Sequence, residues 1–125
     1  MKTLKTLEPL TDRLLEIQRI NSAASVLSWD QETYMPAGGG TARAEQIATL
    51  QGIAHQQLVS SDTDRLLARW LDLKTGFPLE ADGELWDESS SALLREVWRD
   101  YSRAKKLPSE FVTRLSRECS LAQQV

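Results

Sequence analysis

Apolar residues recur at every third or fourth position along most of the chain, which is the spacing of amphipathic helices. Pro9 suits the first turn of a helix that begins near residues 6–8, because the missing N–H of proline is not needed there. We expect this helix to continue past Trp29. The apolar face of its first half is formed by Leu7, Leu10, Leu14 and Ile17.

The run Met-Pro-Ala-Gly-Gly-Gly at residues 35–40 interrupts this pattern. Proline disfavours helix in the residue before it, and glycine has no side chain that favours a helix. The run therefore predicts a loop, after which Thr41 is the expected N-cap of a second helix. The apolar face of that helix is expected to hold Ala44, Ile47, Leu50, Leu58 and either Ile53 or Ala54.

Three more helices are indicated beyond it. Ser61 and Asp64 resemble a capping box and predict a third helix that ends at Gly76. Residues 74–83 form a connection from which Phe77 is expected to enter the core, and a fourth helix follows over roughly residues 85–106. The apolar faces of the third, fourth and fifth helices are expected to include Leu66, Leu67, Trp70, Leu71 and Leu73, then Leu94, Val97, Trp98 and Tyr101, and finally Phe111 or Val112, Leu115 and Cys119.

The connection before the fifth helix is Leu107-Pro108-Ser109, which ends one helix and caps the next. No run alternates between apolar and polar residues over the length of a strand beside a turn signal. The fold class predicted is therefore all-α, an antiparallel helical bundle of four to five helices over residues 1–125.

Composition excludes several classes of partner. The net charge is −3, and 15 basic residues are interleaved with 18 acidic ones, so no basic stripe is present to follow a nucleic acid backbone. Charges and Pro9 interrupt every apolar run near the N-terminus, so neither a signal peptide nor a membrane-spanning helix is expected. A cytoplasmic location is the resulting expectation.

The chain contains few candidates for catalytic or metal-binding residues. His55 is the single histidine, so the zinc motif H-E-x-x-H cannot be built here. A site made of His55 and carboxylates stays open as an alternative to a surface or interface histidine. Asp30 and Glu32 are two positions apart and do not face each other on a helix, so Asp30 is better explained as a partner of an arginine or a helix end. Glycines 38–40 lack the neighbours of a phosphate loop and are interpreted as a turn.

The single cysteine and the four tryptophans also have structural explanations. Cys119 has no thiol partner and is expected to pack as a small apolar residue. The four tryptophans are expected to fill a core or an interface, and Trp86, which is flanked by acidic residues, is the one most expected to be partly exposed.

Two groups of residues carry a resemblance to a known family. Residues 27–40 read Leu-Ser-Trp-Asp-Gln-Glu-Thr-Tyr-Met-Pro-Ala-Gly-Gly-Gly, and Arg-Ala-Glu-Gln follows at residues 43–46. Leu-Arg-Glu at residues 94–96 and Lys-Leu-Pro at residues 106–108 extend the match. Together they resemble the N-terminal signature of the carboxypeptidase Taq family. We define the signature residues as Trp29, Asp30, Met35, Pro36, Gly38, Gly39, Arg43, Glu45 and Gln46.

The resemblance implies a larger, mostly helical, cytoplasmic metallocarboxypeptidase that removes C-terminal residues from peptides with zinc or cobalt. Its metal ligands and catalytic glutamate would lie beyond residue 125, so no catalytic or metal-binding residue is assigned here. On this view residues 1–125 are a truncated N-terminal helical domain that forms and gates one side of the substrate groove. The domain alone should be inactive and bind no metal, and peptide substrates belong to the full-length enzyme only.

The alternative function is a free-standing helical module, derived from such a peptidase and used for dimerisation or regulation. A homodimer is expected in either case. Its contacts are predicted on Leu7, Leu10, Leu14 and Ile17 of the first helix, and on Val112, Leu115 and Cys119 of the last. Asp30 and Arg43, on either side of the loop, are predicted to form an ion pair or a shared cap.

Overall fold

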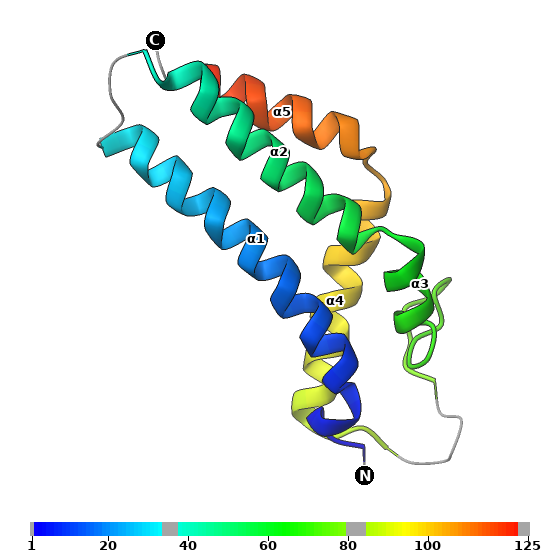
Figure 1. Ribbon diagram of the computed structural model, residues 1–125. Coiled ribbons are helices and arrows are strands. Elements are labelled where there is room, and N and C mark those ends of the chain that lie inside the picture. Colours follow the sequence, from blue (N-terminus) through cyan, green and yellow to red (C-terminus); the bar gives the residue numbers. More distant parts are fainter. Residues whose placement is uncertain (1, 34–37, 80–84, 123–125) are drawn as a thin grey trace. The chain divides into compact units, whose positions relative to one another are not determined.

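The computed structural model describes residues 2–33, 38–79 and 85–122. Among them it contains five α-helices and no strand beyond two isolated bridges, so the predicted all-α class is confirmed (Figure 1). The elements are a 3-10 helix η1 (Leu4–Leu7) and the helices α1 (Glu8–Thr33), α2 (Gly40–Leu58), α3 (Ser61–Leu67), α4 (Glu88–Lys105) and α5 (Ser109–Ala122).

The chain divides into two compact units. Unit 1 consists of residues 1–15 and 58–106, and unit 2 consists of residues 16–57 and 107–125. The boundary within α1 falls between Leu15 and Glu16, so this helix contributes residues to both units. In the described part of the chain, no helix is long and apolar enough to cross a membrane.

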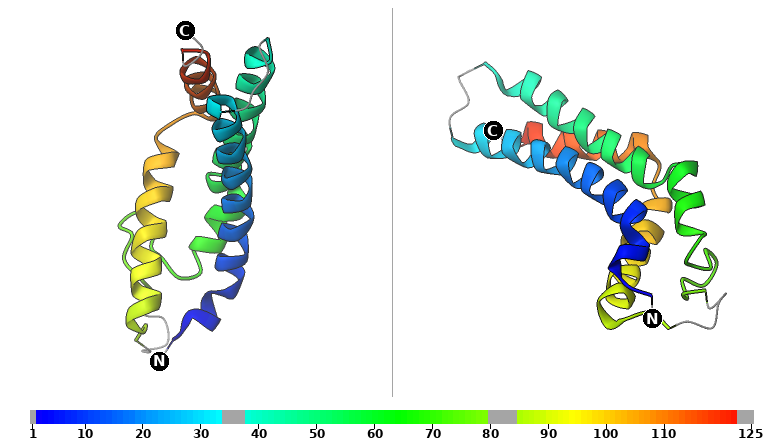
Figure 2. Two further views of the ribbon diagram at one scale, coloured as in Figure 1. Left: turned by 90° about the vertical axis from the view of Figure 1, so that its left-hand side faces the viewer. Right: turned by 60° about the horizontal axis from the view of Figure 1, so that its bottom comes forward.

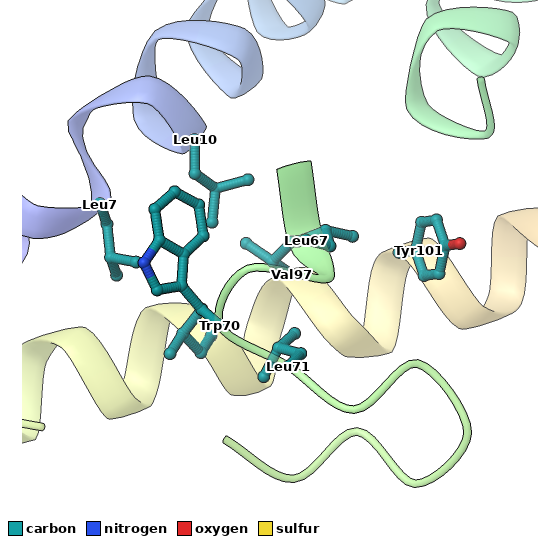
Figure 3. Packing of buried hydrophobic residues seen from close by; sticks show 8 residues of the cluster. Leu7, Leu10, Leu67, Trp70, Leu71, Val97 and Tyr101 are labelled. Atoms are coloured by element: carbon teal, nitrogen blue, oxygen red, sulfur yellow. The ribbon is translucent and has the colours of Figure 1, made fainter. Parts of the chain in front are cut away.

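Unit 1 has a core of large side chains. The core combines the start of α1 with α3, the segment after α3, and α4, as Figure 3 shows. The expected apolar face of α4 is confirmed, since Leu94, Val97 and Tyr101 are buried and Trp98 packs against them. The buried members of the cluster are Leu7, Leu10, Leu67, Trp70, Leu71, Leu94, Val97 and Tyr101.

The third helix is shorter than predicted. It ends at Leu67, and the buried residues Trp70 and Leu71 reach the core from the turns that follow it. Its N-cap is Ser60 rather than Ser61, because the Thr63 N–H donates to the Ser60 hydroxyl at 3.4 Å. The apolar spacing thus located the core residues correctly but extended the helix too far.

The connection after α3 folds back on itself. Leu71 forms an isolated antiparallel bridge with Pro78, and the Asp72 N–H donates to the Phe77 carbonyl at 2.9 Å. Leu71 points into the core, and successive residues of extended backbone point to opposite sides. Phe77 therefore faces outward with 72% of its surface exposed, and the expectation that it enters the core was wrong. Gly76 makes the turn with a φ of 79°.

The fourth helix begins at Glu88, three residues after its predicted start. Asp87 is its N-cap, and the Asp87 carboxylate accepts a hydrogen bond from the Ser90 N–H at 2.8 Å. At the other end of the helix, Tyr101 donates to the Asp64 carboxylate, which Lys105 also contacts at 3.0 Å. These bonds fix α4 against α3 within unit 1.

Unit 2 is built from small residues. The later part of α1, α2 and α5 lie side by side, with α2 running opposite to the other two (Figures 1 and 2). The α2 face that packs inward holds Ala54 rather than Ile53, which is 38% exposed. α2 begins at Gly40, so Thr41 lies in its first turn instead of capping it, a difference of one residue. The buried residues of unit 2 are Ile17, Ala24, Gly40, Ala44, Ile47, Ala48, Gly52, Ala54 and Ser120.

Large apolar side chains of unit 2 face outward. Phe111 and Leu115 of α5 are about half exposed, and Cys119 is exposed, so the expectation that Cys119 packs inside was wrong. Trp29 is 56% exposed, whereas Trp86 is half-buried under the Lys2 ammonium, 4.9 Å from its ring centroid. The most exposed tryptophan among the four is therefore Trp29.

Candidate functional site

The signature residues gather where α1 ends and α2 begins, within unit 2. Met35 and Pro36 lie outside the described residues. Gly38 adopts a φ of 88°, a backbone conformation that other residues rarely adopt. Gly39 accepts the Arg43 N–H at 3.1 Å and so stands just before the first turn of α2.

Asp30 and Arg43 form the predicted ion pair. The Asp30 Oδ2 lies 3.1 Å from a terminal guanidinium nitrogen of Arg43, and the two side chains are 31% and 24% exposed. The pair joins the last turns of α1 to the first turns of α2. Because Asp30 is paired with an arginine and Glu32 is exposed, the geometry gives no support to an acid/base role for these two carboxylates.

Two further polar contacts attach α5 to this helix pair. Glu45, a signature residue, lies 2.7 Å from the Arg117 guanidinium. Gln31 donates from its side-chain amide to the Ser120 carbonyl at 3.3 Å. Sequence reasoning did not assign Gln31 or Arg117, because their partners are more than 70 positions away and no local spacing signals such a pair.

An open hollow of about 400 Å³ lies between α1 and α2. Its lining is mostly apolar, with Leu27 on one helix and Leu50 and Thr49 on the other. Glu45 and Gln46 complete the lining with polar groups. The sequence identified these two polar residues through the signature and placed Leu27 and Leu50 on apolar faces, but it did not predict that the two leucines line one hollow. The available signal was the spacing of Gln46 and Leu50, which places both on one side of α2.

His55 has a local partner at the other end of α2. Its Nδ1 lies 2.6 Å from the Ser109 hydroxyl at the start of α5, and the ring is half-buried. Over the described ranges, no three His, Cys, Asp or Glu side chains come close enough together to hold a metal ion.

This combination, an all-α chain with an ion-paired helix hairpin that carries the signature residues, agrees with a specific class of protein. The family model for carboxypeptidase Taq (M32) metallopeptidases matches residues 9–125, and the chain belongs to this family.

Among curated proteins, the chain is similar to thermostable carboxypeptidase 1 of Thermus thermophilus. The two are 32% identical over 123 residues, which cover 94% of this chain and 22% of the relative. The chain thus spans about a fifth of the length of that protein. No solved structure matches the chain.

Proposed function

We propose that this chain forms one wall of the peptide groove of a metal-dependent carboxypeptidase. The observation that carries the proposal is the hollow between α1 and α2, in which two signature residues line an apolar floor. Peptide sites commonly combine an apolar surface for side chains with a few polar groups that fix the orientation of the backbone. Membership of the metallopeptidase family supports a peptide as the ligand.

The apolar and polar residues of the hollow would contact different parts of the peptide. Leu27 and Leu50 would contact an apolar side chain of the peptide, and the Gln46 amide would donate to or accept from its backbone. Glu45 is held by Arg117, which keeps its carboxylate at the edge of the hollow. These residues bind and orient the peptide, and bond cleavage belongs to groups of the enzyme that are not among them.

The Asp30–Arg43 ion pair supports a gating role for the α1–α2 hairpin. It joins the two helices on either side of the turn, close to the N-terminal end of α2. A pair with side chains less than a third exposed can hold the two helices of the hairpin together in one arrangement. The hairpin would then move as one element when a peptide enters.

The first experiment uses the chain by itself. After dialysis against zinc or cobalt, elemental analysis should find no stoichiometric metal, and no C-terminal residue should be released from a test peptide. A catalytic zinc needs about three protein ligands, and the chain contains one histidine and one cysteine. One tightly held metal ion per chain, or metal-dependent release of C-terminal residues, would contradict the proposal.

The second experiment supplies the remainder of an enzyme. A chimera of thermostable carboxypeptidase 1 in which this chain replaces the matching segment should retain carboxypeptidase activity. Gln46→Ala and Leu50→Ala in the chimera should raise KM at least as much as they lower kcat, because they remove peptide contacts. Gln56→Ala, at an exposed glutamine of the same helix outside the hollow, serves as the matched control. Unchanged KM in both hollow variants of an active chimera would refute the peptide-binding role.

A further inference from the structure

A serine and a histidine of unit 2 lie in hydrogen-bond contact where α2 ends and α5 begins. His55, in the last turn of α2, places its Nδ1 2.6 Å from the hydroxyl of Ser109, the first residue of α5. In the neutral imidazole that carries its proton on Nε2, Nδ1 accepts a hydrogen bond from this hydroxyl. A base in this position can take the proton of a hydroxyl as its oxygen attacks an electrophilic carbon. The contact therefore pairs a nucleophile with a base.

Two backbone donors at the start of α5 have no partner in the described part of the chain. They are the N–H groups of Ser109 and Glu110, whereas those of Phe111 and Val112 donate to the Pro108 carbonyl at 3.0 and 3.2 Å. The first N–H groups of a helix lack acceptors within the helix and lie at its end. Backbone donors of this kind stabilise the oxyanion that forms when a nucleophile adds to a carbonyl group. Here they belong to the nucleophilic serine and to the residue after it.

A hollow of about 400 Å³ opens beside this serine. We call it the Ser109 hollow, and its walls include Gln56 of α2, Thr113 and Arg114 of α5, and Ser109 itself. Its volume lies within the range of small-molecule sites, roughly 300–1,000 Å³. Arg114 has no ion-pair partner among the described residues, so its guanidinium is available to a polar group of a bound molecule. A small molecule in the Ser109 hollow therefore lies beside a nucleophile, backbone donors and a cation.

We infer that Ser109 and His55 accept acyl groups from small activated esters and hydrolyse them. The Ser109 oxygen adds to the ester carbonyl carbon while its proton passes to His55 Nδ1, and the N–H groups of Ser109 and Glu110 stabilise the oxyanion. The bond from the carbonyl carbon to the alcohol oxygen then breaks, and the leaving alcohol takes the proton from His55. Water next adds to the acyl-serine and gives a proton to His55, which returns it to the Ser109 oxygen as the carboxylic acid leaves. This activity goes beyond the proposed function and does not depend on it, because none of these residues lines the hollow proposed to bind peptides.

Ser116 provides a matched comparison within the same helix. It lies about two helical turns after Ser109, is likewise half-buried, and lines a different hollow of about 330 Å³. The single histidine of the chain contacts Ser109, so Ser116 has no imidazole base beside it. A serine whose reactivity depended on exposure alone would react like Ser116, whereas an activated serine should react selectively.

The hydrolysis of p-nitrophenyl acetate by the chain tests the proposal. Each chain should release more than one equivalent of p-nitrophenolate, and peptide mapping by mass spectrometry after acid quenching should locate the acetyl group on Ser109. Ser109→Ala should lower the rate by about tenfold or more, because a positioned acid–base group commonly contributes a larger factor. Ser116→Ala should leave the rate unchanged. Circular dichroism verifies that each variant is helical.

His55→Gln separates the chemistry from the contact between the helices. Glutamine can still form a hydrogen bond with the Ser109 hydroxyl but supplies no base, so this variant should unfold at a temperature close to that of the original chain and still lose activity by a similar factor. Full activity in Ser109→Ala together with loss in His55→Gln would mean that the imidazole acts without the serine, which would overturn the proposal. Hydrolysis no faster than in buffer, equal rates in the Ser109→Ala and Ser116→Ala variants, full activity in His55→Gln, or acetyl groups on lysines alone would each overturn it as well.

Discussion

The two units of the chain bury different kinds of side chain in their cores. Unit 1 buries leucines and aromatic rings, among them Leu67, Leu94 and Tyr101. Unit 2 buries chiefly alanine, glycine and serine, and it leaves Trp29 and Leu115 more than half exposed. Burial of large apolar side chains is the main source of folding free energy, so the difference predicts that unit 1 carries more of the stability.

Unit 2 compensates with close helix approach and polar contacts. Its small residues allow α2 and α5 to come together so tightly that Gly52 has no room for a Cβ beside Thr113. Ion pairs then join its helices in two places, Asp30–Arg43 and Glu45–Arg117. A unit of this kind keeps its large apolar residues available for contacts outside itself. The comparison therefore predicts that most of the stability comes from unit 1, whereas the hollow proposed to bind peptides belongs to unit 2.

Removal of a large side chain from unit 1 should have the largest effect. Leu94 is fully buried, so Leu94→Ala should lower the free energy of unfolding by about 3 kcal/mol through lost apolar contact and the cavity left behind. Leu115→Ala, at a position 52% exposed in unit 2, should change it by less than about 0.5 kcal/mol. Urea unfolding at low protein concentration measures both, and equal losses would remove the distinction between the units.

In unit 2, the addition of a single methyl group should be destabilising, in contrast to the removal of a side chain in unit 1. A Cβ at Gly52 would lie 2.3 Å from the Thr113 hydroxyl oxygen, so Gly52→Ala should cost about 1 kcal/mol despite the better helix propensity of alanine.

Thr113→Ala provides the control for this substitution, because it removes the hydroxyl that blocks the space. In that background Gly52→Ala should become neutral or stabilising, since only the propensity term is left. Thermal unfolding of the four proteins checks the change of sign. The same loss in both backgrounds would mean that close helix approach at Gly52 does not limit unit 2.

Much of the fold was predictable because helices follow from local spacing. The apolar face of α4 and the break after α1 are visible in the sequence, and both were predicted within a few residues. The outward turn of Phe77 was not predictable, because it depends on the bridge between Leu71 and Pro78, which involves no periodic pattern. The apolar spacing near the end of the chain also predicted the helix α5 correctly. Spacing alone, however, does not tell whether another helix covers the apolar face.

The candidate site was predictable in part for a similar reason. Asp30 and Arg43 lie on either side of a short loop, so their contact follows from the hairpin itself. Arg117 and Glu45 come from helices far apart in the sequence, and their contact requires knowledge of how α5 packs. The hollow beside Gln46 likewise depends on two helices at once. The functional roles of the signature residues remain predictions.

The Asp30–Arg43 pair tests whether polar contacts matter more in unit 2 than on an open surface. A cycle of Asp30→Ala, Arg43→Ala and the double variant should give a coupling free energy of about 1 kcal/mol, because both side chains are less than a third exposed. The reference is the Asp62–Arg65 pair of unit 1, whose side chains are 67% and 74% exposed and should couple by nearly zero. Strictly additive losses at Asp30 and Arg43 would show that the pair does not stabilise the hairpin.

The smallest expected effect concerns acid and the N-terminus of α4 in unit 1. The Ser90 hydroxyl and the Ser90 backbone N–H, which lie beside the Asp87 carboxylate, lower the pKa of Asp87 from its ordinary value of 3.8. The folded state therefore favours the ionised carboxylate, and its stabilisation is present above pH 3.8 and is lost as the pH falls through the lower folded value. Asp87→Asn retains a capping acceptor without a titrating group, so its stability relative to the original chain should improve as the pH falls through this range. Tryptophan fluorescence of a Trp29→Phe background follows unit 1 selectively, because Trp70, Trp86 and Trp98 all belong to that unit. A constant difference in stability between the original chain and the Asp87→Asn variant across the acid range would contradict this prediction. It would mean that the cap is equally strong in both protonation states of Asp87.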